Sequence, residues 1–228
     1  YLPTEQIVYR VQHKNINSLY ARLIKIPNGL LENGQDYRRE TQEEKIKRFY
    51  QMPVFKTWSE TIKNIGDYQS HSSELQLNSL PIGKYILLVS DGEGYSPTAK
   101  VAHSDFTVSR LSHISRQVGA QGSFQAYVLD RKSGEPVNKA KVIAYTSQYD
   151  YSNRRNQTRK IGEYFSDQMG NVKVITNLRN QNIRLVITSK KDTLISPNAY
   201  YGRYYRQNEK KRIQTHFFTD RAIYRPGQ

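Results

Sequence analysis

Apolar side chains recur at every second residue in many short segments of this chain, and turn-forming residues separate the segments. Ile7, Tyr9 and Val11 share one side of a predicted strand, and Leu75 and Leu77 repeat the pattern. A period of two places alternate side chains on opposite faces, so each strand has one face to bury. Such strands become stable when two sheets pack their apolar faces together. The pattern therefore predicts an all-β chain of antiparallel β-sandwiches, of the fibronectin III or immunoglobulin-like kind.

The first half contains four more segments with this one-sided pattern. Their inward-facing residues are predicted to be Leu19, Ala21 and Leu23; Trp58 and Ile62; Tyr85, Leu87 and Val89; and Phe106 and Val108. Each segment is short and ends at polar or turn-forming residues, which is typical of sandwich strands. We expect all of them to belong to one sandwich.

The alternation stops between Ser109 and Gly122, where small and polar residues are frequent. We interpret this stretch as a link between two domains. A chain of 228 residues can bury either one large core or two small ones. We therefore predict two tandem sandwiches, residues 1–112 and residues 113–228.

In the second half, a new strand is predicted at Phe124–Asp130, and Lys141–Tyr145 is predicted to pair with it. The turn between them contains Gly134 and Pro136, as a hairpin connection requires. Further elements are expected around Asp167–Asn171 (a turn), Val172 and Val174, Ile183 to Ile187, and Ile213 to Phe217.

One segment lacks the alternation and predicts a short helix near residues 39–51. Thr41 and Glu44 have the spacing of a capping box, Ile46 contributes to a narrow apolar face, and Pro53 follows as a stop signal. We expect this helix to be inserted between two strands of the first sandwich. Its charged face is interpreted as solvated, with a binding surface as the alternative.

The segment Leu80–Tyr85 predicts a tyrosine corner, a turn whose tyrosine hydroxyl bonds back to the backbone. Pro81 restricts φ, Gly83 permits the turn, and Tyr85 enters the next strand. The alternative is an unspecialised turn before a strand. In either case the role is structural rather than catalytic.

The net charge of +15 is concentrated in the second half of the chain. Residues 1–112 contain 14 Lys and Arg against 12 Asp and Glu, whereas residues 113–228 contain 21 against 8. Within the second half, basic residues alternate with tyrosines in two clusters, which are predicted to be long loops. The residues concerned are Tyr149, Tyr151, Arg154, Arg155, Tyr200, Tyr201, Arg203, Tyr204, Tyr205 and Arg206.

These Tyr/Arg clusters are the candidate partner-binding residues of the chain, because tyrosine and arginine are enriched at protein–protein hot spots. The simplest alternative is that the loops are solvated extensions whose rings cover a neighbouring sandwich. A glycan partner is a further alternative. We expect no nucleic-acid partner, since the charge lies in loops of a sandwich without a known reader motif.

Candidate residues for catalysis are missing from the sequence. There is no cysteine, which excludes disulfides, thiolate metal sites and a cysteine nucleophile. The five histidines, His13, His71, His103, His113 and His216, lack metal-ligand spacing. Asp91–Gly94 vaguely resembles a calcium loop, but the later ligand positions carry no acid, so a plain turn is predicted. We expect no enzyme activity, no cofactor, no metal site and no membrane span.

The last residues, Phe217–Gln228, resemble the Phe-Thr-Asp-Arg-x-x-Tyr-Arg-Pro-Gly-Gln signature of bacterial α2-macroglobulin-like proteins. In that family the signature marks the junction between consecutive macroglobulin-like domains. The matching residues are Thr219, Asp220, Arg221, Tyr224, Arg225, Pro226 and Gly227. The Leu-Pro-x-Gly-x-Tyr element at Leu80–Tyr85 and the Ser-Gly-Glu-Pro-Val turn followed by Asp-x-x-Gly are also similar to macroglobulin-like modules. Residues 1–70 match by pattern only.

This resemblance implies that the chain is an N-terminal piece of a protease trap, in which endopeptidase inhibition follows cleavage of a bait segment. It implies that these domains are a non-catalytic scaffold whose partners are downstream domains of the same polypeptide and, for the full-length protein, a protease. It also implies export to the periplasm or outer cell surface, with a lipid anchor outside this chain. The alternative is a cell-surface adhesin pair that binds protein or glycan through the Tyr/Arg clusters.

Overall fold

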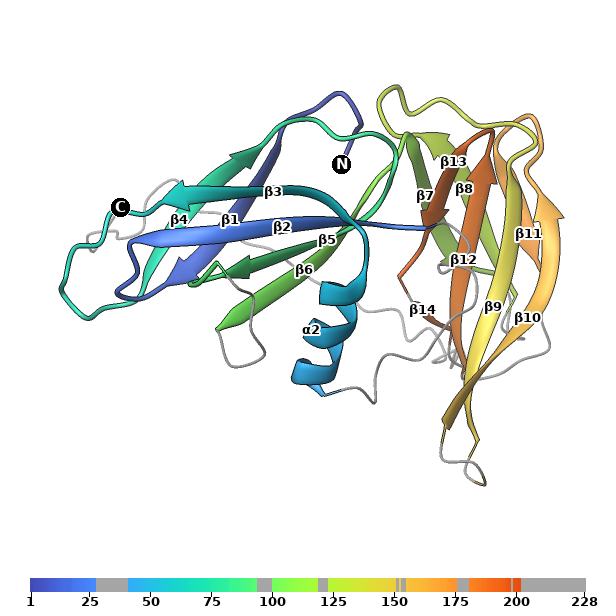
Figure 1. The fold of residues 1–228 in the computed structure, drawn as a ribbon. Coiled ribbons are helices and arrows are strands. Elements are labelled where there is room, and N and C mark those ends of the chain that lie inside the picture. Colours follow the sequence, from blue (N-terminus) through green and yellow to red (C-terminus); the bar gives the residue numbers. More distant parts are fainter. Residues whose placement is uncertain are drawn as a thin grey trace, which may run out of the picture.

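Two β-sandwiches follow one another along the chain, and helix α2 lies beside the first (Figure 1). The structure is a computed structural model. It describes residues 1–27, 41–93, 100–118, 123–150, 152, 155–175, 181–197 and 199–201. All strand pairs between these residues are antiparallel, which confirms the predicted fold class. Within this part of the chain, no helix has the length and apolar character needed to cross a membrane.

The first sandwich packs a two-stranded sheet against a four-stranded sheet. The strands are β1 (Ile7–His13), β2 (Ser18–Ile26), β3 (Val54–Thr61), β4 (His71–Leu77), β5 (Gly83–Ser90) and β6 (Val101–Val108). Strands β1 and β4 form the small sheet, and the large sheet has the order β3-β2-β5-β6. The predicted inward faces are confirmed, because Ile7, Leu19, Leu23 and Leu87 are buried in one cluster.

Helix α2 (Gln42–Gln51) covers the face of the large sheet that points away from this core. Its capping box is formed as predicted, since the Thr41 side chain accepts from the Glu44 backbone N–H and the Glu44 carboxylate accepts from the Thr41 N–H. Phe49 from the helix packs with three buried residues of the sheet, Ile24, Ile86 and Leu88. Strand β5 is therefore buried on both faces, which explains its continuous apolar run.

The second sandwich packs a three-stranded sheet against a larger one. The strands are β7 (Leu111–Gln117), β8 (Phe124–Asp130), β9 (Lys141–Asp150), β10 (Arg155–Phe165), β11 (Asn171–Val174), β12 (Gln181–Ser189), β13 (Asp192–Ile195) and β14 (Ala199–Tyr201). The smaller sheet has the order β11-β8-β7, and the larger one has the order β10-β9-β12-β13, with β14 paired to β12. This sandwich has its own core, which includes Phe124, Val128, Val142 and Leu185.

Two expectations about the second sandwich are wrong. The stretch Ser109–Gly122 is not an irregular link throughout, because Leu111–Gln117 form β7 and pair with β8. The apolar alternation is absent from this stretch because most residues of β7 lie outside the core. Likewise, Lys141–Tyr145 does not pair with Phe124–Asp130, because β9 belongs to the opposite sheet.

The connection between β8 and β9 explains the second error. The chain folds back on itself only briefly after β8, where the Asp130 N–H donates to the Glu135 carbonyl at 2.7 Å and the Val137 N–H donates to the Val128 carbonyl at 2.9 Å. The Gly and Pro residues therefore serve a local turn, as predicted. The chain then crosses the core, and β9 joins the other sheet.

The tyrosine corner is present. The Tyr85 hydroxyl donates to the Pro81 carbonyl oxygen at 2.7 Å, and the Tyr85 residue is fully buried. The Phe106 ring stacks on the Tyr85 ring with centroids 5.7 Å apart. Burial raises the pKa of Tyr85 to about 12, because the phenolate would be poorly solvated there. The corner therefore ties the turn before β5 to the centre of the first core.

The Asp-x-x-Gly turn of the second sandwich depends on glycine at its last position. Asp167 Oδ1 accepts from the Met169 and Asn171 N–H groups, and Gly170 has φ of +70°. A Cβ on Gly170 would lie 2.4 Å from the Val128 carbonyl oxygen. The Val128 N–H also donates to the Gly170 carbonyl at 2.8 Å. Only glycine allows this turn to approach β8 so closely.

Candidate functional site

Two residues, Ser109 and Arg110, join the sandwiches, since β6 ends at Val108 and β7 begins at Leu111. Ser109 is fully buried, and its N–H donates to the Tyr1 carbonyl oxygen at 2.9 Å. The Ser109 hydroxyl oxygen accepts from the Leu111 N–H at 2.9 Å. The first residue of the connection is thus held by the N-terminal segment and by the start of the next strand.

Arg110 is held by the second sandwich. Its N–H donates to Asp192 Oδ2 at 2.7 Å, and its carbonyl oxygen accepts from the Arg131 N–H at 2.6 Å. The Arg131 side chain adds a further bond, from Nε to the Leu111 carbonyl at 3.1 Å. Asp192 lies at the start of β13, and Arg131 lies just after β8. The connection is therefore fixed by two separate turns of the second sandwich.

The segment before β1 contacts the junction on the side of the first sandwich. The Tyr1 backbone nitrogen donates to the Thr107 carbonyl oxygen at 2.9 Å, and the Tyr1 ring meets the Phe106 ring edge-on at 5.6 Å. The segment before β1 therefore packs on the end of β6, directly before the connection.

Asp192 is the least expected residue of the junction, because it is a carboxylate with only 6% of its surface exposed. Its Oδ2 accepts the Arg110 N–H, whereas its buried Oδ1 has no hydrogen-bond partner among the described residues. A hydrogen bond to a charged acceptor contributes about 1.5–3 kcal/mol, more than a neutral one. Burying this carboxylate costs desolvation free energy, so the junction depends on the hydrogen bond from the Arg110 N–H to Asp192 Oδ2.

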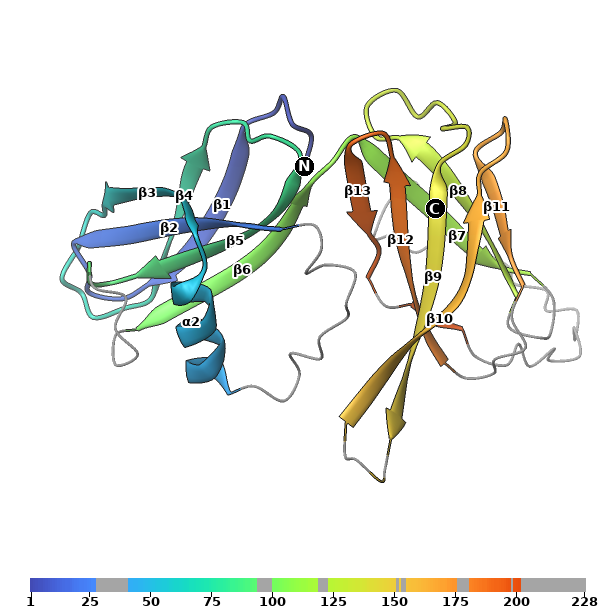
Figure 2. The same cartoon turned by 45° about the vertical axis from the view of Figure 1, so that its right-hand side comes forward.

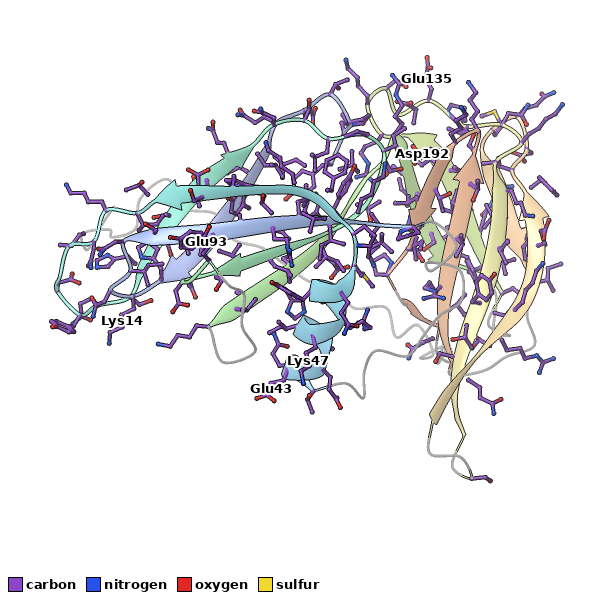
Figure 3. All side chains as sticks on the ribbon, viewed as in Figure 1. Lys14, Glu43, Lys47, Glu93, Glu135 and Asp192 are labelled. Atoms are coloured by element: carbon purple, nitrogen blue, oxygen red, sulfur yellow. The ribbon has the colours of Figure 1, made fainter. Side chains whose placement is uncertain are left out.

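A hollow of about 800 Å³ opens at the junction. Its lining includes basic and acidic side chains as well as apolar ones, namely Ile82, Arg110, Glu135, Pro136, Lys190 and Asp192. Figure 3 shows Glu135 and Asp192 at the same end of the second sandwich. No group of three or more His, Cys, Asp or Glu side chains that could hold a metal occurs among the described residues.

The turn after β8 gives one wall of this hollow a defined shape. Asp130 Oδ1 accepts from the Lys132 N–H at 2.9 Å and from the Ser133 N–H at 3.0 Å. The backbone bond from Ser133, followed by that from Lys132, lowers the pKa of Asp130. Gly134 completes the turn with φ of +76°, and its N–H donates to the Asp130 carbonyl. The arrangement supports a fixed contact surface rather than proton transfer.

The first Tyr/Arg cluster is not a long loop, as the sequence suggested, but the end of a β-hairpin. Tyr149 pairs with Asn156 and Asp150 pairs with Arg155. Strand β9 pairs with β12 only from Lys141 to Ser147, so beyond that point β9 and β10 continue as two strands. Figure 2 shows this hairpin extending past the rest of the second sandwich. Tyr151 and Arg154 lie outside the described residues.

The second Tyr/Arg cluster begins in β14, where Tyr200 pairs with Asn182 and Tyr201 with Gln181. Asn182 pairs with Ser147 of β9 on its other side. Since neighbouring strands are about 4.8 Å apart, Tyr200 lies about 10 Å from Ser147, two residues before the first cluster, so the two clusters begin at the same end of the sheet. Arg203, Tyr204, Tyr205 and Arg206 lie outside the described residues. So do the motif residues Thr219, Asp220, Arg221, Tyr224, Arg225, Pro226 and Gly227.

The described histidines do not come together as one site. His13 and His71 lie across β1 and β4, with ring centroids 6.2 Å apart, and His71 contacts Asp67 at 2.8 Å. His103 lies beneath α2 and contacts Gln42. Burial, more than the charge of Arg131, lowers the pKa of His113. His216 lies outside the described residues, as does Gly94 of the predicted Asp91–Gly94 turn.

Sequence reasoning missed Arg110, Arg131 and Asp192, which form the junction. The hydrogen bond between Arg110 and Asp192 joins residues 82 positions apart, so no local sequence pattern predicts it. One weak signal was available, because Asp192 follows Lys190 and Lys191 in a tight turn and directly precedes an apolar strand. An acid at that point is well placed to accept backbone N–H groups.

Two solved structures resemble this chain in fold. One is native alpha-2-macroglobulin from Escherichia coli spanning domains NIE-MG1, with a TM-score of 0.53 and 14% identity over 82% of this chain and 86% of that chain. Another spans domains MG0-NIE-MG1 of the same protein, with a TM-score of 0.59 and 12% identity over 82% of this chain and 57% of that chain. No protein-family model and no curated protein matches the sequence. At these identities the similarity concerns the fold.

Proposed function

We propose that this chain supplies two consecutive, non-catalytic macroglobulin-like domains, joined at Ser109 and Arg110, to a bacterial α2-macroglobulin-like protein. The fold similarity to Escherichia coli alpha-2-macroglobulin supports the proposal. The Thr219–Gly227 motif supports it independently, because it comes from the sequence. The observation that carries the proposed role is the junction, in which Arg110 is bonded to Asp192 and Arg131 of the second sandwich.

In the proposed role the two sandwiches are scaffold for endopeptidase inhibition. A protease would cut a bait segment elsewhere in the protein, and the surrounding domains would close around it. A scaffold that takes part in such a movement needs neighbours that keep their relative orientation. The bonded junction meets this requirement. The partners are further domains of the same polypeptide and the trapped protease, and the proposed location is the periplasm or outer cell surface.

The junction is tested by comparing Asp192→Ala with Asp192→Asn in the 228-residue chain. The asparagine keeps an oxygen that can accept the Arg110 N–H, whereas the alanine does not. We expect Asp192→Ala to lower the free energy of unfolding by about 2 kcal/mol and to broaden the distribution of interdomain distances. Small-angle scattering measures the distribution. Asp105→Ala, an exposed change in β6, is the control. An unchanged scattering profile for Asp192→Ala would contradict a junction held by this bond.

The trapping role is tested on the full-length protein. A broad-specificity protease is mixed with it, and the cleavage of a large protein substrate is followed. We expect the rate to fall in proportion to the amount of full-length protein added. A protease that stays fully active while it degrades the protein would overturn the trapping role and leave the scaffold fold intact.

A second candidate function is a cell-surface binding pair that uses the Tyr/Arg clusters. The observation that favours it is the hairpin beyond Ser147, which brings basic segments away from the sandwich (Figure 2). The sequence following Gln228 separates the two candidates. Further sandwich domains and a helical thioester-type domain support the scaffold, whereas a short tail or a catalytic domain supports the binding pair.

A further inference from the structure

A second hollow, of about 370 Å³, lies on the first sandwich and is separate from the junction. Its main lining side chains come from β2, β3, the end of α2 and the turn after β5, and they are Tyr20, Arg22, Tyr50, Thr57, Ser59 and Glu93. Ala21 and Trp58 also belong to the described lining. Figure 3 shows Glu93 beside the large sheet of this sandwich.

The strand register places these side chains on the sheet face that α2 covers. Tyr20 pairs with Ser59 and Arg22 pairs with Thr57, and paired residues share a face. Their neighbour Ala21 is buried in the core cluster, so the alternation sends Tyr20 and Arg22 to the opposite face. The hollow therefore lies where α2 stops covering the sheet, in the gap beside its last turn.

Arg22 and Tyr50 form one wall of this hollow. The guanidinium carbon of Arg22 lies 4.2 Å from the centre of the Tyr50 ring, and Arg22 Nη1 donates to the Tyr50 carbonyl at 3.4 Å. The Tyr50 residue is 43% exposed, while Tyr20 is half-buried. Stacking fixes the orientation of a flexible arginine and lowers the entropy lost when it binds a ligand. The wall is thus organised without any ligand.

The chemistry of the lining suits a neutral polyol. Arginine offers only donors, and glutamate offers only acceptors when ionised, whereas the Thr57 and Ser59 hydroxyls can do both. One positive and one negative group give the lining no net attraction for an anion or a cation. A sugar ring presents hydroxyls that both donate and accept, together with C–H faces that pack against aromatic rings such as Tyr20 and Tyr50. The volume is at the lower end of the usual range for ligand pockets, about 300–1,000 Å³.

We propose that this hollow is a saccharide-binding site that accepts a neutral hexopyranose unit of a glycan. Glu93 accepts from a pair of sugar hydroxyls on one side, and Arg22 donates to sugar oxygens on the other. Tyr20 and Tyr50 pack against the C–H face of the ring. The proposal goes beyond the scaffold role and is independent of it, because the junction residues take no part.

The test uses the 228-residue chain and three free sugars, glucose, galactose and mannose, each followed by saturation-transfer NMR. We expect transfer to at least one of them. We also expect Glu93→Gln to weaken that binding by about fivefold or more, because a charged acceptor is replaced by a neutral amide. Glu93 is exposed, so the melting temperature should stay unchanged. Glu135→Gln is the matched control, since Glu135 is an exposed glutamate beside the other hollow.

Thr57→Val and Ser59→Ala give a second check, because both residues are exposed and each change removes one hydroxyl. We expect each to weaken sugar binding while Glu135→Gln leaves it unchanged. The proposal is overturned if none of the three sugars shows transfer at concentrations that saturate weak sites. Equal binding by Glu93→Gln and Glu135→Gln would overturn it as well. Tighter binding of glucuronate than of glucose would show an anion site and would contradict the neutral ligand.

Discussion

The two sandwiches fill their cores with different kinds of side chain. In the first, large aromatic rings lie in or against the core, namely Tyr9, Trp58, Tyr85 and Phe106. In the second, Phe124 is the fully buried ring of the described cluster and Tyr164 packs against it partly buried, while the rest of the cluster is aliphatic, with Ala126, Ala140 and Ala144 among its members. The first sandwich has a two-stranded small sheet, whereas the second has a three-stranded one.

This difference teaches how a sandwich can compensate for a narrow sheet. A protein interior must be filled to about the density of an organic crystal, so a core covered by fewer of the described strands needs larger side chains. Rings reach further from the backbone than valine or alanine does. The Tyr9–Trp58 and Tyr85–Phe106 ring pairs of the first core, with centroids 6.4 Å and 5.7 Å apart, fit that requirement. The second core achieves the same filling with more backbone and smaller side chains.

The comparison predicts that one aromatic truncation in the first core costs more than an aliphatic one in the second. We expect Tyr85→Ala to lower the free energy of unfolding by about 4 kcal/mol and Val128→Ala to lower it by about 2 kcal/mol. Trp58 is the single tryptophan of the chain, so its fluorescence reports the first sandwich, while circular dichroism follows both. Similar losses for the two variants would show that both cores are filled in the same way.

The second sandwich relies instead on a close backbone approach at Gly170. We expect Gly170→Ala to cost about 3 kcal/mol, because a Cβ would lie 2.4 Å from the Val128 carbonyl oxygen and φ is +70°. Gly134→Ala is the matched control, since its φ of +76° is similar but a Cβ would meet nothing within 4 Å. Its expected cost is about 1 kcal/mol. Urea denaturation measures both, and equal costs would rule out the steric explanation.

The tyrosine corner predicts a loss of stability in alkali that belongs to the first sandwich. In the folded chain the pKa of Tyr85 is about 12, whereas an unfolded tyrosine ionises near 10. The unfolded state loses its proton first, so stability is fully present below pH 10 and falls between pH 10 and pH 12. The loss attributable to Tyr85 is on the order of 2 kcal/mol.

The measurement compares Trp58 fluorescence during denaturation of the wild type and of Tyr85→Phe from pH 8 to pH 12. Tyr85→Phe should be less stable by about 1 kcal/mol at pH 8, because the bond to the Pro81 carbonyl is lost. Its alkaline decline should be shallower than that of the wild type. Parallel declines would mean that other groups cause the alkaline loss.

The smallest expected effect concerns α2, the helix that packs on the first sandwich. Thr41→Ala removes the side chain that accepts the Glu44 N–H and should cost about 1 kcal/mol. In Thr41→Ala, hydrogen exchange of the α2 amides should be faster than in the wild type, and this increase should exceed any increase for the β5 amides. Ser70→Ala, an exposed change in a loop, should leave both unchanged. If the α2 amides exchange at the wild-type rate in Thr41→Ala, the capping box does not stabilise the docked helix.

Local features of the fold could be predicted from sequence because a few neighbouring residues determine them. The alternation identified the inward faces, Thr41 and Glu44 identified the start of α2, and Pro81 to Tyr85 identified the corner. Each of these is decided by side chains no more than a few positions apart. The run Ile86–Val89 could not be explained in this way, since its second buried face depends on the position of α2.

Pairing over long distances could not be predicted. Strand β9 pairs with β10 and β12 rather than with β8, and periodicity is the same for either arrangement. The sequence predicted a long loop for the first Tyr/Arg cluster. The structure shows that cross-strand bonding continues there to Asp150. For the junction, the sequence contains Arg110 and Asp192 but nothing that relates them.

The two-residue connection has a mechanical consequence. A connection whose backbone groups are bonded to both sandwiches resists rotation more than a free linker of the same length. A force applied to one sandwich would therefore pass to the other through the bonds of Ser109 and Arg110, with less of it absorbed by bending at the connection.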